Sequence, residues 1–110
     1  MPITYKVLGQ SAPAATTNTN LYTVPAATSA VISTIVVANR VATSATYRIA
    51  IRPAGAAIAN QHYIAYDVTV AAADSITLTL GITLAATDII TVYASTTNLS
   101  FSVFGSEITS

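Results

Sequence analysis

Alternation of apolar and polar residues is clearest between residues 28 and 53, where it predicts two β-strands joined by a short polar turn. In the second half of this segment Tyr47, Ile49 and Ile51 recur at every second position. Successive side chains leave opposite faces of a strand, so this period indicates one buried face. The first half, residues 31–38, is richer in β-branched residues and alternates less strictly, which is typical of a strand covered on both faces or lying mid-sheet. We therefore expect a central hairpin.

Six further segments resemble strands separated by turn residues. Proline, glycine, asparagine and aspartate cluster at their ends, where they favour turns or interrupt a sheet ladder. The segments are residues 3–8, 21–24, 62–70, 75–80 with a continuation at 82–84, 89–94 and 99–105. About eight short strands without an amphipathic helix predict an all-β fold, either an antiparallel β-sandwich or a jelly-roll-like arrangement.

The apolar faces of these strands give an expected core that is mostly aliphatic. A short echo, in which residues 73–77 resemble 87–91, places Asp74 and Asp88 directly before two strands. Each aspartate is expected to accept a hydrogen bond from backbone amides there. The echo also puts Ile90 and Ala94 on the core side. The predicted core residues are Val31, Ile35, Val37, Tyr47, Ile49, Ile51, Ile64, Tyr66, Val68, Ile76, Leu78, Leu80, Ile90, Val92, Leu99, Phe101 and Val103.

The length of 110 residues suits one domain, so residues 1–110 are expected to form a single β-sandwich. Within it, residues 9–20 are small and polar and contain Pro13, which predicts a flexible or arm-like loop. Residues 54–61 have some helical character, but Gly55 and the preceding proline favour a loop or a single turn.

Charged residues are scarce, and this argues against some classes of function. Only 7% of the residues are charged and the net charge is zero, against about 25% charged residues in a typical soluble domain. Nucleic-acid binding needs a cationic patch, which four basic residues offset by four acids do not supply. No apolar run is long enough for a membrane-spanning helix, and the N-terminus lacks a signal-peptide layout. A neutral surface repels itself weakly, which favours association with other proteins.

The sequence offers few candidate catalytic residues. His62 is the only histidine, and a Ser-His-Asp triad would have to combine it with Asp67 or Asp74. No Gly-x-Ser-x-Gly elbow supplies a nucleophile, so we expect a partly exposed histidine at a strand start. Asp74 and Asp88 at one end of the sandwich would give a glycosidase pair, although a short chain leaves little room for a cleft. With no cysteine and scattered acids, we predict a protein that is not an enzyme and has no metal or cofactor site.

Five residues are candidates for protein contacts. Arg48 and Arg52 share a strand face, which is either an ordinary solvated face or an interface, because arginine is favoured in protein contacts. Exposed tyrosines serve protein contacts or sugar stacking, and half-buried strand packing explains them equally well. The candidate interface residues are Arg40, Arg48, Arg52, Tyr5 and Tyr22.

Several landmarks together resemble small virion structural proteins of tailed bacteriophages. They are Leu-Tyr-Thr-Val-Pro at 21–25, the strand and turn at 47–55, residues 84–93, and the closing Phe-Gly-Ser-Glu-Ile at 104–108. The resemblance covers residues 21–108. It implies a β-sandwich that assembles on a phage particle, and it carries over no catalytic or ligand residue.

The resemblance and the composition lead to a capsid decoration (cement) protein as the first expectation. Such a protein would bind the shell exterior and bridge capsomers, with the major capsid protein or other virion proteins as partners. We expect a homo-oligomer, with a trimer favoured, that is made in the host cytoplasm and resides in the virion. The alternatives are a tail, neck or fibre component, or a carbohydrate-binding or adhesin module.

Overall fold

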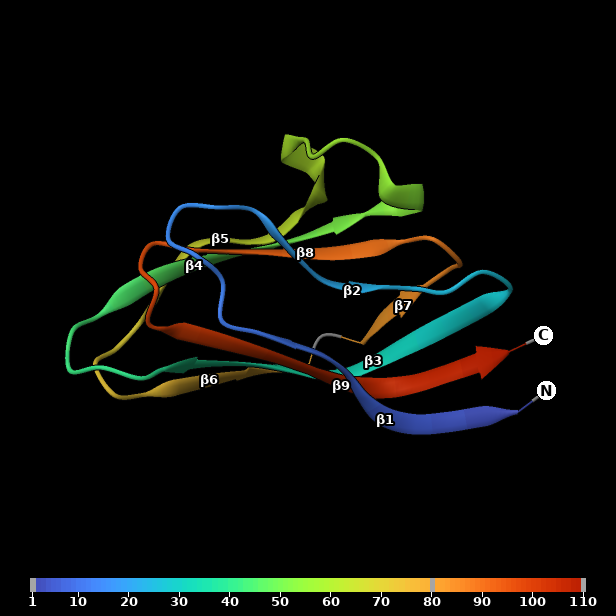
Figure 1. Cartoon of the computed structure of the whole chain (residues 1–110), viewed down its shortest axis with the longest axis horizontal. Coiled ribbons are helices and arrows are strands. Elements are labelled where there is room, and N and C mark those ends of the chain that lie inside the picture. Colours follow the sequence, from blue (N-terminus) through green and yellow to red (C-terminus); the bar gives the residue numbers. More distant parts are fainter. Residues whose placement is uncertain (1, 80, 110) are drawn as a thin grey trace.

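Two antiparallel sheets face each other across an apolar core in the computed structural model, which describes residues 2–79 and 81–109 (Figure 1). The first sheet has the order β1 (Ile3–Ser11), β9 (Leu99–Thr109), β3 (Thr28–Asn39) and β6 (Ser75–Leu78), with β7 (Ile82–Leu84) also pairing with β3. The second has the order β2 (Thr19–Thr23), β8 (Ile89–Ala94), β4 (Ala45–Arg52) and β5 (Tyr63–Val70). The all-β sandwich prediction is therefore confirmed.

The strand pairs are nested along the sequence: the outermost strands pair with each other, and each pair further in joins the next strands toward the middle. β1 pairs with β9, β2 with β8, β3 with β6 and β7, and β4 with β5, all antiparallel. The chain behaves like a long hairpin rolled over itself, so that neighbouring pairs of strands fall in alternate sheets. This is the double-sheet jelly-roll arrangement.

The expected hairpin between β3 and β4 is wrong, because the two strands lie in different sheets. Residues 40–44 instead cross from one sheet to the other. Buried Asn39 organises the crossing by donating from Nδ2 to the Thr43 carbonyl at 2.7 Å and the Ala71 carbonyl at 3.2 Å. Its Oδ1 accepts from the Val41 amide at 3.2 Å. A hairpin and such an arch share one sequence pattern of strand, polar turn and strand, so alternation alone does not separate them.

A bulge in β3 explains why Val31, expected in the core, is 39% exposed. The register against β9 shifts between Ile32 and Thr34, so one extra residue enters β3 there. Each inserted residue reverses which positions face inward. Ala30 and Ile32 are consequently buried before the bulge, and Ile35 is buried after it.

The core assignment also fails in β5, where Ile64, Tyr66 and Val68 are exposed. The pairing of β4 with β5 shifts register twice, and Asp67 has a φ of 52°. Aspartate tolerates this left-handed backbone better than most residues, which suits a bulge position. The bulges break the single alternating face that the sequence suggested for this strand.

Most of the remaining core predictions are confirmed. Fully or nearly fully buried as expected are Ile35, Val37, Tyr47, Ile49, Ile90, Val92, Leu99, Phe101 and Val103. Ile51, Ile76 and Leu78 are partly buried against them, and Leu80 lies outside the described residues. Buried hydrophobic residues that the pattern missed are Leu21, Tyr22, Val24, Ala30, Ile32, Ala45, Ala50, Val70 and Leu84. Tyr47 and Phe101 meet edge to face at 6.3 Å, linking the two sheets.

The segment expected to be an arm, residues 9–20, is only partly loop. β1 continues to Ser11, Pro13 is buried, and the Thr16 amide donates to the Ala94 carbonyl at 2.8 Å. The segment therefore lies against β8, and its flexibility stays a prediction. Residues 54–61, expected to be a loop or a single turn, contain parts of two short 3₁₀ turns, η1 (Pro53–Gly55) and η2 (Asn60–His62), joined by a loop.

Candidate interaction surfaces

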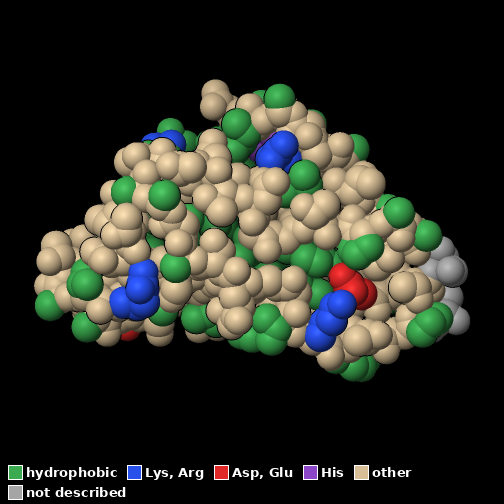
Figure 2. All heavy atoms as spheres, viewed as in Figure 1, with side chains coloured by type: hydrophobic (Ala, Val, Ile, Leu, Met, Phe, Trp, Pro, Cys, Tyr) green, Lys and Arg blue, Asp and Glu red, His purple; other side chains and the backbone are tan. Residues whose placement is uncertain are grey.

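The outer face of the β1–β9–β3 sheet carries a shallow apolar groove of about 560 Å³. Its apolar wall comes from Tyr5 and Val7 of β1, Val31 of β3 and Phe104 of β9. Tyr5 is 82% exposed and Val7 is 50% exposed, so no other part of the described chain covers them. Charged side chains are sparse over the face seen in Figure 2. The groove is therefore an uncovered apolar surface on a weakly charged molecule.

Close approach of two strands forms the floor of this groove. A Cβ atom on Gly105 of β9 would lie 2.1 Å from the Val31 carbonyl oxygen and 3.1 Å from Ile32 Cα. Only glycine allows the backbone of β9 to approach the β3 bulge this closely. The bulge, in turn, is what turns Val31 outward to the groove.

An ion-pair cluster joins the two sheets beside the groove. Lys6 Nζ lies 2.6 Å from Glu107 Oε1, and the Tyr22 hydroxyl donates to Glu107 Oε2 at 2.5 Å. The hydrogen bonds from Lys6 and Tyr22 lower the pKa of Glu107 below its usual value. Burial, together with the Glu107 carboxylate, raises the pKa of Tyr22 well above its usual value. Tyr22 thus stays a neutral donor.

We expect Glu107→Gln to lower the free energy of unfolding by about 1 kcal/mol at pH 7, because it removes an ion pair and a charged acceptor. A depressed carboxylate pKa stabilises the fold above the unfolded pKa of about 4.3, and this contribution disappears as the pH falls through the folded pKa. The difference between the two proteins should therefore shrink below about pH 4. Urea unfolding from pH 7 to pH 3 measures this difference in the free energy of unfolding. Asp74→Asn, which removes a carboxylate elsewhere, is the control; an equal effect would contradict the assignment.

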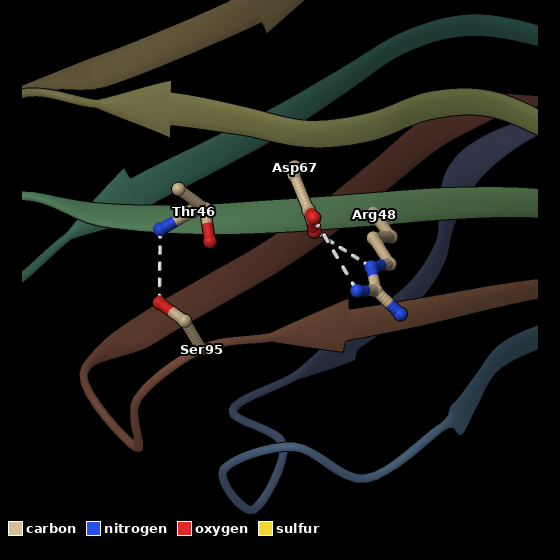
Figure 3. Close-up of polar contacts among 4 residues, drawn as sticks. All are labelled: Thr46, Arg48, Asp67 and Ser95. Atoms are coloured by element: carbon tan, nitrogen blue, oxygen red, sulfur yellow. Dashed lines mark hydrogen bonds and ion pairs between the residues drawn. The ribbon is translucent and has the colours of Figure 1, made fainter.

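A second cluster lies on the outer face of the other sheet, around Arg48 of β4. Its Nε and Nη2 donate to the two carboxylate oxygens of Asp67 at 2.6 Å and 3.3 Å (Figure 3). The guanidinium also lies 4.1 Å from the ring centre of Tyr66 and 4.3 Å from that of Tyr93. The hydrogen bond to Asp67 raises the pKa of Arg48, and the guanidinium cation lies against both rings.

The other two candidate arginines hold loops in place. Arg52 donates to the Ala56 carbonyl at 2.7 Å and the Asn20 side chain at 3.1 Å, tying the loop after β4 to β2. Arg40 Nη2 donates to the Thr97 carbonyl at 2.6 Å and holds the turn between β8 and β9. Each arginine thus has a structural role, and a partner contact by Arg40, Arg48 or Arg52 stays a prediction.

The two candidate tyrosines differ in position. Tyr5 is the most exposed large apolar side chain of the described residues and lines the groove. Tyr22 is buried instead, because the register shift between Asn20 and Tyr22 in β2 turns it inward toward Glu107. Of the candidate set, only Tyr5 presents a broad free surface.

The candidate catalytic residues are engaged in local structure. His62 is buried rather than partly exposed, because it ends a 3₁₀ turn where its Nδ1 accepts from the Ala59 amide at 3.1 Å. Asp88 accepts from the Ala54 and Ala85 amides, both at 2.8 Å. Asp74 accepts from the Ser75 amide at 2.8 Å, so the expected bonding of both aspartates to backbone amides is confirmed.

Residues 2–79 and 81–109 contain no group of three or more histidine, cysteine, aspartate or glutamate side chains placed to hold a metal ion. Over the same residues, no helix has the length and apolar character needed to cross a membrane. No family model matches the sequence, and a search of curated proteins finds no similar one.

Proposed function

We propose that this chain is a structural subunit of the virion of a tailed bacteriophage, and specifically a capsid decoration protein. The observation that carries the proposal is the uncovered, mostly apolar groove beside Tyr5, whose one charged lining residue, Lys6, is paired with Glu107. Exposed apolar patches on soluble domains mark surfaces that other proteins cover. The jelly-roll order of the strands is common among capsid domains, which supports the proposal by analogy of fold.

The proposed mechanism is passive docking. An apolar side chain or loop of the shell protein fills the groove between Val31 and Phe104. The desolvation cost stays low because the one charged lining residue, Lys6, is already paired with Glu107. A bound subunit stabilises the assembled shell by mass action, because it binds the assembled state and not the separated one. Many equivalent sites on the shell multiply the effect.

The first test is the copy number of this chain in purified particles, by quantitative mass spectrometry against the major capsid protein. We expect a ratio near that of the shell subunit. A ratio one or two orders of magnitude lower would contradict decoration and support a tail, neck or fibre component. Absence from particles would overturn the virion proposal.

A matched pair of variants tests the groove itself. Val31→Asp places a charge in the groove, whereas Ile64→Asp places the same charge on an exposed apolar residue of β5 in the other sheet. Cosedimentation with shells lacking the protein should fall for the first variant and stay unchanged for the second. Equal binding by both would overturn the assignment of the groove.

A carbohydrate-binding module is the second candidate, and the Arg48 cluster is the observation that favours it. Tyr66 is 56% exposed and lies beside the carboxylate of Asp67, and an aromatic ring next to a hydrogen-bonding carboxylate is suited to a sugar. A glycan array decides between the candidates. Binding that Tyr66→Ala abolishes would support this function over a purely structural one.

A further inference from the structure

We propose that β1 is a self-association edge, at which two copies of this chain pair antiparallel and join their β1–β9–β3 sheets into one continuous sheet. Only β9 pairs with β1 among the described residues, so the other edge of β1 is open. Residues 2–7 are all exposed. The inference concerns the solution state of the chain and does not require the proposed function.

The other sheet edges carry features that discourage such pairing. β5 has two register shifts and the exposed Asp67, and β2 has five residues and a register shift. β6 and β7 have four and three residues. Bulges, charge and short length are the usual means of protecting an edge. Residues 3–7 of β1 lack them, since the register against β9 is regular there and the one charge, Lys6, is already paired with Glu107.

The sequence of β1 is complementary to itself in one antiparallel register. A two-fold axis at Tyr5 places Tyr5 opposite Tyr5 of the second copy and Ile3 opposite its Val7. These three side chains share the outer face and are 52%, 82% and 50% exposed for Ile3, Tyr5 and Val7. Apolar and aromatic cross-strand pairs of this kind stabilise sheets. An axis at Lys6 would instead oppose two ammonium groups, so the register about Tyr5 is favoured.

Charge complementarity supports the same register. Thr4 is opposite Glu107 in the β1–β9 pairing, and the two-fold axis at Tyr5 puts Lys6 of the second copy opposite Thr4. Glu107, Thr4 and the second copy's Lys6 then lie in one row on the same face. The row spans two strand spacings of about 4.8 Å each, which long lysine and glutamate side chains can bridge. Each glutamate thereby faces a lysine from both copies.

Charge-swapped variants test the register by analytical ultracentrifugation from micromolar to millimolar concentration. We expect the wild-type chain to dimerise. Ile3→Lys with Val7→Lys, or Ile3→Glu with Val7→Glu, puts like charges opposite each other twice and should weaken dimerisation at least about tenfold. An equimolar mixture of the two variants should regain the dimer, because every pair is then lysine with glutamate. Circular dichroism confirms that each variant is folded.

Ile64→Lys with Val68→Lys is the matched control, because it adds the same charges to exposed residues of the β5 edge and should leave the dimer intact. A wild-type chain that stays monomeric would overturn the proposal. So would a trimer, or any oligomer, that the β1 variants leave unchanged, or a mixture of charge variants that fails to associate.

Single cysteines give an independent measurement of the register, since the chain has none of its own. Directly opposite residues of antiparallel strands have Cα atoms about 4.5–5.5 Å apart, which a disulfide can span. Tyr5→Cys should therefore cross-link to itself under mild oxidation, whereas Thr4→Cys should not. Equal cross-linking of both variants, or of neither, would overturn the register.

Discussion

Replacing Asn39 by aspartate is expected to lower the free energy of unfolding by about 4 kcal/mol at pH 7, because it buries a charge and leaves the Val41 amide as its one donor among the contacts that Asn39 makes. The side-chain amide donates to the Thr43, Ala71 and Val70 carbonyls, at 2.7, 3.2 and 3.5 Å. A carboxylate in the same place would face three oxygens and lose the donors. Aspartate has nearly the same shape as asparagine, so the loss of stability comes from the charge and the lost hydrogen-bond donors and not from altered packing.

The pH dependence of Asn39→Asp separates this explanation from a general loss of structure. Facing oxygens, the new carboxyl should have a folded pKa above its unfolded value of about 3.9. When the folded pKa of a carboxyl group is raised, its ionisation does not lower the free energy of unfolding below the unfolded pKa. The loss of stability then grows as the pH rises from the unfolded pKa toward the folded pKa. Urea unfolding should show a larger loss of stability relative to the wild type at pH 7 than at pH 3.5. Asn18→Asp, at an exposed position, is the control, and a pH-independent difference would contradict the prediction.

Replacing Gly105 by alanine is expected to cost about 3 kcal/mol, because overpacking a closely fitted site forces the backbone to move. The added Cβ would lie 2.1 Å from the Val31 carbonyl oxygen, which belongs to the backbone of a central strand and has little freedom to shift. Thermal or urea unfolding measures the loss.

Gly81→Ala provides the comparison for Gly105→Ala. Gly81 has a φ of 65°, and a Cβ there would meet nothing within 4 Å. Its substitution should cost only the strain of a left-handed backbone, about 1 kcal/mol. If the two alanine variants lose equal stability, backbone contact at Gly105 is not the cause.

Alternation predicted the inward faces of β4, β8 and β9 because these strands keep one phase over their apolar positions. It failed in β3 and β5, where inserted residues reverse the phase. The sequence does carry a signal of each reversal. Ser33 and Thr34 separate two isoleucines by three positions in β3, and Asp67 interrupts β5 with a residue disfavoured in strands.

The candidate surfaces were less predictable than the fold because they depend on which strands are neighbours. Tyr5 could be singled out as a contact residue, but its groove needs β9 and β3 beside β1. Arg48 meets Tyr66 and Tyr93 only because β4 lies between β5 and β8. Periodicity fixes the face of a strand and leaves the order of strands open.

The pairing of β1 with β9 has a consequence for synthesis of the fold. Ile3 is opposite Ile108, so β9, the partner of β1, leaves the ribosome after the eight other strands of the described residues. Until then β1 exposes both edges, and β3 lacks its long neighbour β9. A nascent chain of this topology cannot complete its first sheet piecewise, because β9 must be available before β1 and β3 can reach their native register.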